Sequence, residues 1–147
     1  MARGAAGVAL ALALLAPGIA RAGDASFRVA LATWSHRIGL DARGIGLSAV
    51  HRHPRRLTAR ALHFRADALR ALHSLSAVPV STVRGGRAKR FALAAFRDYT
   101  LVGGLWALAG RARVTHHNVV AARDARLAAA QAKRGGFLLV QASKLLH

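Results

Sequence analysis

Apolar residues recur at three- and four-residue steps through much of this chain, the spacing that places them on one face of a helix. The stripe that predicts a first helix, from residue 26 to about 48, consists of Phe27, Leu31, Trp34, Ile38, Ile45 and Ala49. The stripe that predicts a second helix, over residues 55–76, consists of Leu57, Ala61, Phe64, Ala68, Leu72 and Leu75. Glycine lowers helix propensity, so we expect the first helix to fray or break near Gly44.

The third predicted helix, residues 87–110, is apolar around most of its circumference. Its two adjacent faces consist of Phe91, Ala95, Asp98, Val102, Leu105 and Ala109, and of Phe96, Tyr99, Gly103 and Trp106. Such a helix must be surrounded by other elements, so we expect it at the centre of the fold with Trp106 buried. The Gly103-Gly104 pair indicates either a close helix contact or a kink.

A fourth helix is predicted over residues 119–134, with Asn118 as its N-terminal cap. Gly135-Gly136 is a candidate interruption, after which apolar residues keep helical spacing to the C-terminus. The connectors between the four helices are mostly short, which favours antiparallel neighbours. We therefore predict an all-α domain over residues 23–147, a four-helix up-down-up-down bundle that follows an N-terminal signal peptide.

Residues 1–22 have the three parts of a secretory signal peptide. Arg3 supplies the positive charge, residues 8–16 form the apolar segment, and Ala20-Arg21-Ala22 is the cleavage motif. Pro17-Gly18 is expected to break the helix ahead of that motif. The apolar run is short for a membrane span, so we predict cleavage after Ala22, with an uncleaved N-terminal anchor as the alternative.

The charge balance changes the picture more than any motif. The 147 residues include 23 Lys and Arg but only 5 acidic residues, all Asp, for a formal net charge of +18. Such a chain repels itself and attracts polyanions such as nucleic acid, anionic lipid or acidic glycan. A bias toward Ala, Arg and Gly would give the same balance; so would an unselected reading frame, although the export signal and the helical periodicity argue against that origin. The absence of Cys excludes disulfides, thiolate metal ligands and a Cys nucleophile.

The densest run of positive charge consists of Arg52, Arg55, Arg56 and Arg60. The group that is expected to join it, just before the third helix, consists of Arg84, Arg87, Lys89 and Arg90. Arginines of this kind bind phosphates without reading a sequence, and no motif of a sequence-specific nucleic-acid reader is visible. We predict binding of anionic polymers or lipid headgroups, and the alternative is a solvated basic face without a ligand.

Histidines offer a second candidate site. The four that lie in the first and third connectors, at the same end of an up-down-up-down bundle, are His51, His53, His116 and His117. Imidazoles bind zinc, copper or nickel, so these residues could form a metal site or a pH-responsive surface. The flanking arginines oppose a cation, and no carboxylate lies nearby in the sequence to offset them. Exposed connector histidines without a ligand are the simpler interpretation.

The aspartates are interpreted as structural. The expected ion pairs are Asp41 with Arg37, Asp67 with Arg70, and Asp98, which should be partly buried, with Arg134. A di-iron site of the bundle type needs Glu, which the chain lacks. No nucleophile elbow or phosphate-binding loop occurs, so we predict no enzymatic activity and no cofactor, and no small-molecule substrate is indicated.

These observations together predict an exported, non-enzymatic helical protein of the bacterial cell envelope, periplasmic or extracellular. Its role would be that of a binding or structural module that acts through an Arg-rich surface. A histidine-based metal-binding or pH-responsive envelope protein is the alternative. Salt-sensitive binding to a polyanion would favour the first, and a response to metal ions or chelators would favour the second.

Overall fold

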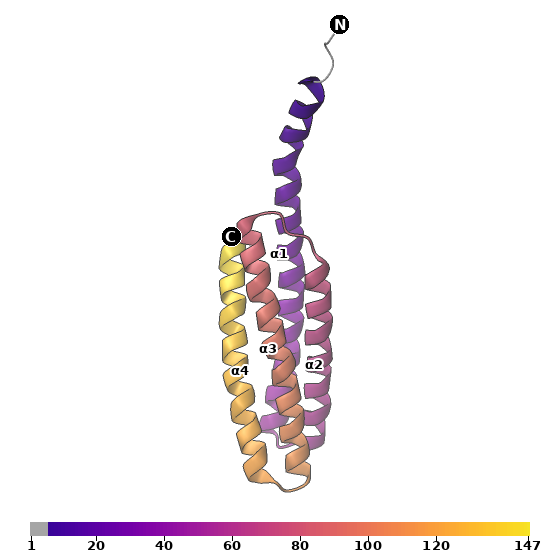
Figure 1. Cartoon of the computed structure of the whole chain (residues 1–147). Helices are drawn as coiled ribbons and strands as arrows, with labels where there is room; N and C mark the ends of the chain where they lie inside the picture. The colour runs from indigo at the N-terminus through magenta and orange to yellow at the C-terminus, as the bar shows by residue number, and fades with distance from the viewer. Residues whose placement is uncertain (1–5) are drawn as a thin grey trace.

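In a computed structural model the chain is described from residue 6 to residue 147, with side chains described from residue 23 onward. The helices are α1 (Ala6–Val50), α2 (Pro54–Ala77), α3 (Val83–Val114) and α4 (Asn118–Leu146). Over the described residues there is no strand. The prediction of an all-α chain with four helices is confirmed, in an arrangement compatible with a helical bundle. Consecutive helices run in opposite directions along a common axis (Figure 1).

Local chemistry explains where α2 and α3 begin. Pro54 is the first residue of α2, a position where its missing N–H has no helical partner to lose and its fixed φ suits a helix. α3 begins at Val83, earlier than the predicted residue 87. The reason is that the Thr82 side chain accepts a hydrogen bond from the N–H of Gly85 at 2.9 Å and so caps the helix.

Two predicted interruptions are wrong. α1 continues past Gly44, and α4 continues through Gly135-Gly136. Burial offsets the low helix propensity of glycine at both places. Ile45 is buried next to Gly44, and Gly135 is itself buried where the ring of Tyr99 packs against it.

The predicted signal peptide, residues 1–22, lies where the structure describes no side chains, so export and cleavage stay predictions. The bounds of α1 include Pro17-Gly18, so the helix break expected there is wrong. A proline removes one intrahelical hydrogen bond and can bend a helix without ending it. In the part of the chain that was described, no helix has a stretch long and apolar enough to cross a membrane.

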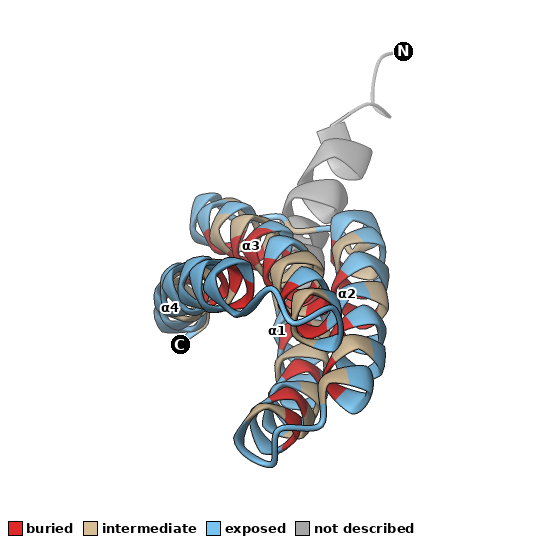
Figure 2. Ribbon diagram, turned by 90° about the horizontal axis from the view of Figure 1, so that it is seen from below, coloured by how far each residue is buried: buried red, intermediate tan, exposed pale blue. Residues whose placement is uncertain are grey.

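α3 lies at the centre of the fold, as its apolar circumference predicts. It packs along much of its length against α2 and α4, whereas α1 packs mainly against α2 and touches α3 and α4 little. Seen along the bundle, buried residues face the neighbouring helices and exposed residues face outward (Figure 2). The predicted stripes are largely confirmed, because the core contains Phe27, Leu31, Ile38, Ile45, Leu57, Ala61, Phe64, Ala68 and Leu75. The stripe members that are only partly buried are Trp34, Ala49 and Leu72.

Gly103 marks a close contact between α3 and α2. A Cβ at this position would lie 2.6 Å from the Cβ of Arg65 and 2.9 Å from the carbonyl oxygen of Ala61, so the two helices could not approach as they do. A Cβ at Gly104 would meet nothing within 4 Å. Gly103 therefore allows α3 to approach α2 closely, whereas Gly104 faces open space.

Candidate functional site

The two connectors that carry the predicted site residues lie at the same end of the bundle (Figure 1). The predicted polyanion-binding residues are all exposed: Arg52, Arg55, Arg56 and Arg60. The last turn of α3 adds Arg111 and Arg113 to this end. We call residues 51–60 and 111–117 the basic end.

Three surface hollows lie at the basic end, and arginine lines each of them. The first, between the end of α1 and the start of α4, includes Arg52 and Arg113. The second, between the two connectors, includes Arg55 and Arg56, and the third, beside α1, includes Arg60. Among the described residues that line these hollows there is no aspartate. The positive charge of the hollows is therefore not neutralised locally.

The second basic group belongs elsewhere. Arg84, Arg87 and Arg90 lie at the start of α3, at the opposite end of the bundle from the connectors (Figure 1), so the expectation that they join the Arg52 group is wrong. Lys89 has a structural role, because its ammonium donates to carbonyl oxygens at the end of α2, at 2.7 and 2.6 Å. The predicted up-down-up-down order already implies this separation, because the second connector lies at the opposite end from the first and third.

The backbone at the basic end is unusual. Arg52 and His116 have positive φ values, 53° and 60°, and they are the non-glycine residues in the described chain that do. Each follows the end of a helix, α1 or α3, where the left-handed conformation is usually adopted by glycine. No described glycine has a positive φ. A large basic side chain therefore occupies each position where glycine would be less strained.

Only some of the four connector histidines lie close to one another. His53 and His116 line the same hollow, and the ring centroids of His51 and His53 lie 6.4 Å apart. The described residues contain one group of three with ligand atoms close enough to share a metal ion, and it consists of Asp41, His63 and Asp67. None of the connector histidines belongs to that group, so the histidine-based metal site stays a prediction.

The Asp41, His63 and Asp67 group joins α1 to α2. Asp67 is fully buried, and it accepts a hydrogen bond from Nε of Arg37 on α1 at 2.6 Å and from Nη1 of Arg70 at 2.7 Å. Nε2 of His63 lies 3.7 Å from Asp41 and 3.6 Å from Asp67. Both oxygens of Asp67 are thus already engaged, and a cation could bind here only by displacing an arginine.

The pKa values of Asp41 and Asp67, the two carboxyl groups at this junction of α1 and α2, shift in opposite directions. Burial alone raises the pKa of Asp67, but the hydrogen bonds from Arg37 and Arg70 outweigh it and hold that pKa below its usual value. Burial, and then the neighbouring carboxyl of Asp67, raise the pKa of Asp41. One oxygen of Asp41 is buried without a hydrogen-bond partner. The junction is therefore an ion-pair network that favours one negative charge over two.

The predicted ion pairs have different outcomes. Asp67 pairs with Arg70 as predicted, and Asp98 is buried with Nε of Arg134 at 3.3 Å, which confirms both its burial and its partner. The pairing of Asp41 with Arg37 is wrong, because Arg37 reaches across the helix interface to the more deeply buried carboxylate.

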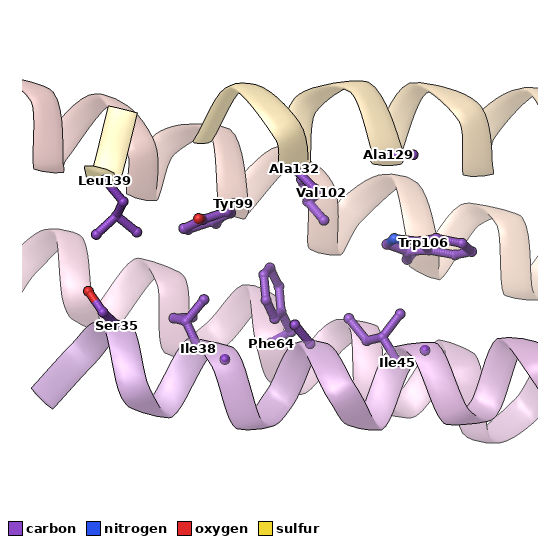
Figure 3. A pocket seen from close by; sticks show the side chains of 13 residues that line it. Ser35, Ile38, Ile45, Phe64, Tyr99, Val102, Trp106, Ala129, Ala132 and Leu139 are labelled. Atoms are coloured by element: carbon purple, nitrogen blue, oxygen red, sulfur yellow. The ribbon is translucent and has the colours of Figure 1, made fainter. Parts of the chain in front are cut away.

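An apolar cavity of about 400 Å³ lies between α1 on one side and α3 and α4 on the other. Figure 3 shows Ser35, Ile38 and Ile45 of α1 facing Tyr99, Val102 and Trp106 of α3 and Leu139 of α4, with Phe64 of α2 between them. The cavity lies where α1 touches α3 and α4 little. Its volume is within the ~300–1,000 Å³ range of ligand pockets.

Sequence reasoning missed this cavity, although a signal for it exists. Gly39, Ala42 and Gly46 recur at three- and four-residue steps and leave α1 without bulk on the side that lines the cavity. Trp106, predicted to be buried, is only partly buried because it lines this space. The phenol of Tyr99 is kept neutral there, since burial and then the charge of Asp98 raise its pKa.

The described residues thus offer two chemistries. The basic end can hold anions by charge and by guanidinium hydrogen bonds, and the cavity can hold an apolar group. At the basic end the hydroxyl of Thr115 lies 2.9 Å from Nδ1 of His117, on the exposed third connector. No protein-family model, no curated protein and no solved structure matches this chain.

Proposed function

We propose that this protein is an exported, non-enzymatic binding module of the bacterial cell envelope that holds anionic polymers on its basic end. One observation carries the proposal: arginines from the first connector, the start of α2 and the last turn of α3 gather at one end of the bundle, and no aspartate is among the described residues that line the hollows between them. A polymer with repeated negative charges can contact several of these arginines at once and release its condensed counterions.

The side-chain type supports a phosphate or carboxylate ligand. Arginine is charged at all physiological pH values and binds both groups through two parallel hydrogen bonds. The four residues of the predicted site are arginines without exception. Their exposure leaves the guanidinium groups accessible to a polymer that approaches from solvent.

The backbone strain at this end is a second support. Non-glycine residues with positive φ are uncommon and are concentrated at functional positions. Arg52 and His116 occupy two such positions, one in each connector. The chain keeps a basic side chain at both turns at some cost in stability, and ligand binding is a reason to keep it.

The test is binding of inorganic polyphosphate, measured by fluorescence anisotropy over a range of salt concentrations. The variant that removes the site replaces Arg52, Arg55, Arg56 and Arg60 with Gln. The logarithm of the parent's affinity should fall linearly with the logarithm of salt. In the variant the slope should be smaller by up to about 0.7 per lost contact, the value for single-stranded polyanions.

A second variant provides a control with the same net charge. It replaces four exposed arginines outside the basic end: Arg84, Arg87, Arg90 and Arg97. If polyphosphate binds through the basic end, this control keeps a slope close to that of the parent. Equal loss in both variants would show that net charge alone attracts the polymer, and the proposal would be abandoned.

The histidine-based alternative is separated by the same assay. A chelator should leave polyphosphate binding unchanged, because no metal ion takes part in a charge-driven contact. Replacing His51, His53, His116 and His117 with Gln should have little effect on polyphosphate binding, because the proposed contacts are made by arginines. A requirement for zinc, copper or nickel would favour the alternative.

A further inference from the structure

The apolar cavity and a charged hollow follow one another along α1, α3 and α4. At its lower end the cavity is lined by Ile45, Trp106 and Ala129. Ala49 follows Ile45 by one helical turn, and Arg113 and Ala122 lie two turns from Trp106 and Ala129 on the same helix faces. These three residues line the hollow that also contains Arg52. The cavity and this hollow thus lie in succession between α1 and α4, and we call the two together the seam.

The two ends of the seam differ in charge. The lower hollow contains Arg52 and Arg113 and no aspartate among its described residues. The upper hollow, beyond Leu139, contains Arg28 and Arg84 but also Asp24. A hydrogen bond from the Thr82 side chain lowers the pKa of Asp24, which therefore stays ionised. Asp24 offsets part of the positive charge of the upper hollow, so an anion that enters the seam is attracted more strongly to the lower end.

The shape of the cavity suits an extended chain. At about 1.5 Å per residue, the lining stretch from Ser35 to Gly46 spans about 16 Å along α1. The lining side chains are aliphatic or aromatic with few polar atoms. The Ser35 hydroxyl is already engaged, since it donates to the carbonyl oxygen of Leu31 at 2.7 Å. A long apolar ligand with one acidic end fits both the walls and the charge.

We propose that the seam between α1 and α4 binds a single-chain anionic amphiphile, with its alkyl chain in the cavity and its acidic group between Arg52 and Arg113. The cavity that would hold the alkyl chain is distinct from the proposed polymer site and does not depend on it, whereas Arg52 and Arg113 belong to the basic end as well. Binding buries apolar surface that water otherwise contacts. It also gives the two arginines a partner for charge-assisted hydrogen bonds.

The experiment is calorimetric titration of the whole chain with sodium dodecanoate below its micelle concentration, and with dodecanol as the uncharged counterpart. One dodecanoate should bind per chain, more tightly than dodecanol. Replacing Arg52 and Arg113 together with Gln should weaken dodecanoate binding by about tenfold, the effect of ~1.4 kcal/mol. The same change should leave dodecanol binding unaltered. A matched control replaces the exposed Arg90 and Arg97 with Gln and should bind both ligands like the parent.

A second pair of variants tests the cavity itself. Ala129 is exposed at the edge of the cavity, so Ala129→Phe should fill the space and weaken dodecanoate binding by tenfold or more, again ~1.4 kcal/mol. Ala130→Phe adds the same ring next to it on an exposed position that does not line the cavity, and should bind like the parent. If Ala129→Phe reduces the helix content, Ala42→Phe blocks the same cavity from α1.

Three results would overturn the proposal. The first is absence of dodecanoate binding, and the second is unchanged binding when the cavity is blocked from either helix. The third is a parent that sediments as a dimer and becomes monomeric with Ala129→Phe, because a second copy would then occupy the seam. Polyphosphate binding should be the same in Ala129→Phe as in the parent, so failure here is distinguishable from failure of the polymer site.

Discussion

The contacts of α3 and those of α1 are made in different ways. α3 meets its neighbours through small residues: Gly103 touches the backbone of α2, and Gly135 of α4 lies against the ring of Tyr99. α1 has an apolar stripe as well, but two carboxylates add to its attachment. Asp67 holds Arg37 of α1, and Asp24 of α1 accepts hydrogen bonds from Ser81 and Thr82 in the connector between α2 and α3.

This difference indicates which helix contacts depend on shape and which depend on charge and therefore change with pH and salt. Close packing of glycine and alanine depends on shape, so it responds little to pH or salt. Ion pairs respond to both. Two charge-dependent contacts attach α1, the helix that also forms one wall of the apolar cavity, whereas α3 has one to α4, the pair of Asp98 with Arg134. Variants at the contacts of α3 and at the contacts of α1 should therefore differ in how much they change the free energy of unfolding and in how that change depends on pH.

The largest effect is expected in the core of α3. Phe96 is fully buried, so Phe96→Ala should lower the free energy of unfolding by about 3–5 kcal/mol, through lost burial and the cavity left behind. Trp106→Ala, on the cavity wall, should lower it by only about 1–2 kcal/mol, because the side chain is partly exposed already. Chemical denaturation measures both. Equal losses would mean that the cavity wall is packed like the core.

The glycine pair of α3 should give changes of opposite sign. Gly103→Ala places a methyl group against the backbone of α2 and should lower the free energy of unfolding by about 1–3 kcal/mol. Gly104→Ala meets nothing within 4 Å, and the better helix propensity of alanine should raise the free energy of unfolding by up to about 1 kcal/mol. Thermal unfolding of the two variants provides the measurement. A stabilising Gly103→Ala would contradict the close contact.

On the other side of the comparison, Asp67→Asn removes the charge that holds Arg37 and Arg70. We expect a loss of about 1.5–3 kcal/mol in the free energy of unfolding, the range for hydrogen bonds to charged groups. Amide hydrogen exchange should accelerate in α1 more than in α3. Asp124→Asn is the control, because Asp124 is also buried but bonds Arg123 of its own helix. If exchange in α1 is the same in both variants, α1 is not held by Asp67.

Acid should loosen α1 before it affects α3. The pKa values of Asp24 and Asp67 are lowered in the folded chain, below the ordinary 3.8. Their stabilising contribution is therefore present above pH 3.8 and is lost as the pH falls through the lowered values. Hydrogen exchange of α1 and α3 over this pH range checks the order. Simultaneous loss of both helices would show that the contacts of α1 and α3 are not separable.

The smallest effect is expected at Asp41. Its pKa is raised above 3.8, so any stability linked to it is greatest below pH 3.8 and is lost as the pH rises through the raised value. Asp41→Asn removes the second negative charge of the junction and should raise the free energy of unfolding at neutral pH by less than about 1 kcal/mol. The gain should vanish in acid. A destabilising change at neutral pH would mean that the charge of Asp41 is needed by His63.

The periodicity of the sequence was sufficient to predict the number of helices, most of the buried stripe of α1 and α2, and the central position of α3. These properties follow from the 3.6-residue repeat, which is local. The shared end of the first and third connectors followed from short loops alone, and the Asp98 and Arg134 pair followed from folding α3 back on α4. All of these depend on distances along one helix or across one turn.

Tertiary structure decided the rest. Arg37 bonds Asp67 of the next helix and not Asp41, which is nearer in the sequence. The cavity exists because α1 packs on α2 and leaves α3 and α4 largely uncovered on that side. The angle and register at which helices cross depend on side chains from both partners at once. The pattern of apolar residues in a sequence predicts which face of a helix is buried. It does not predict the distance between that helix and the one that packs against it.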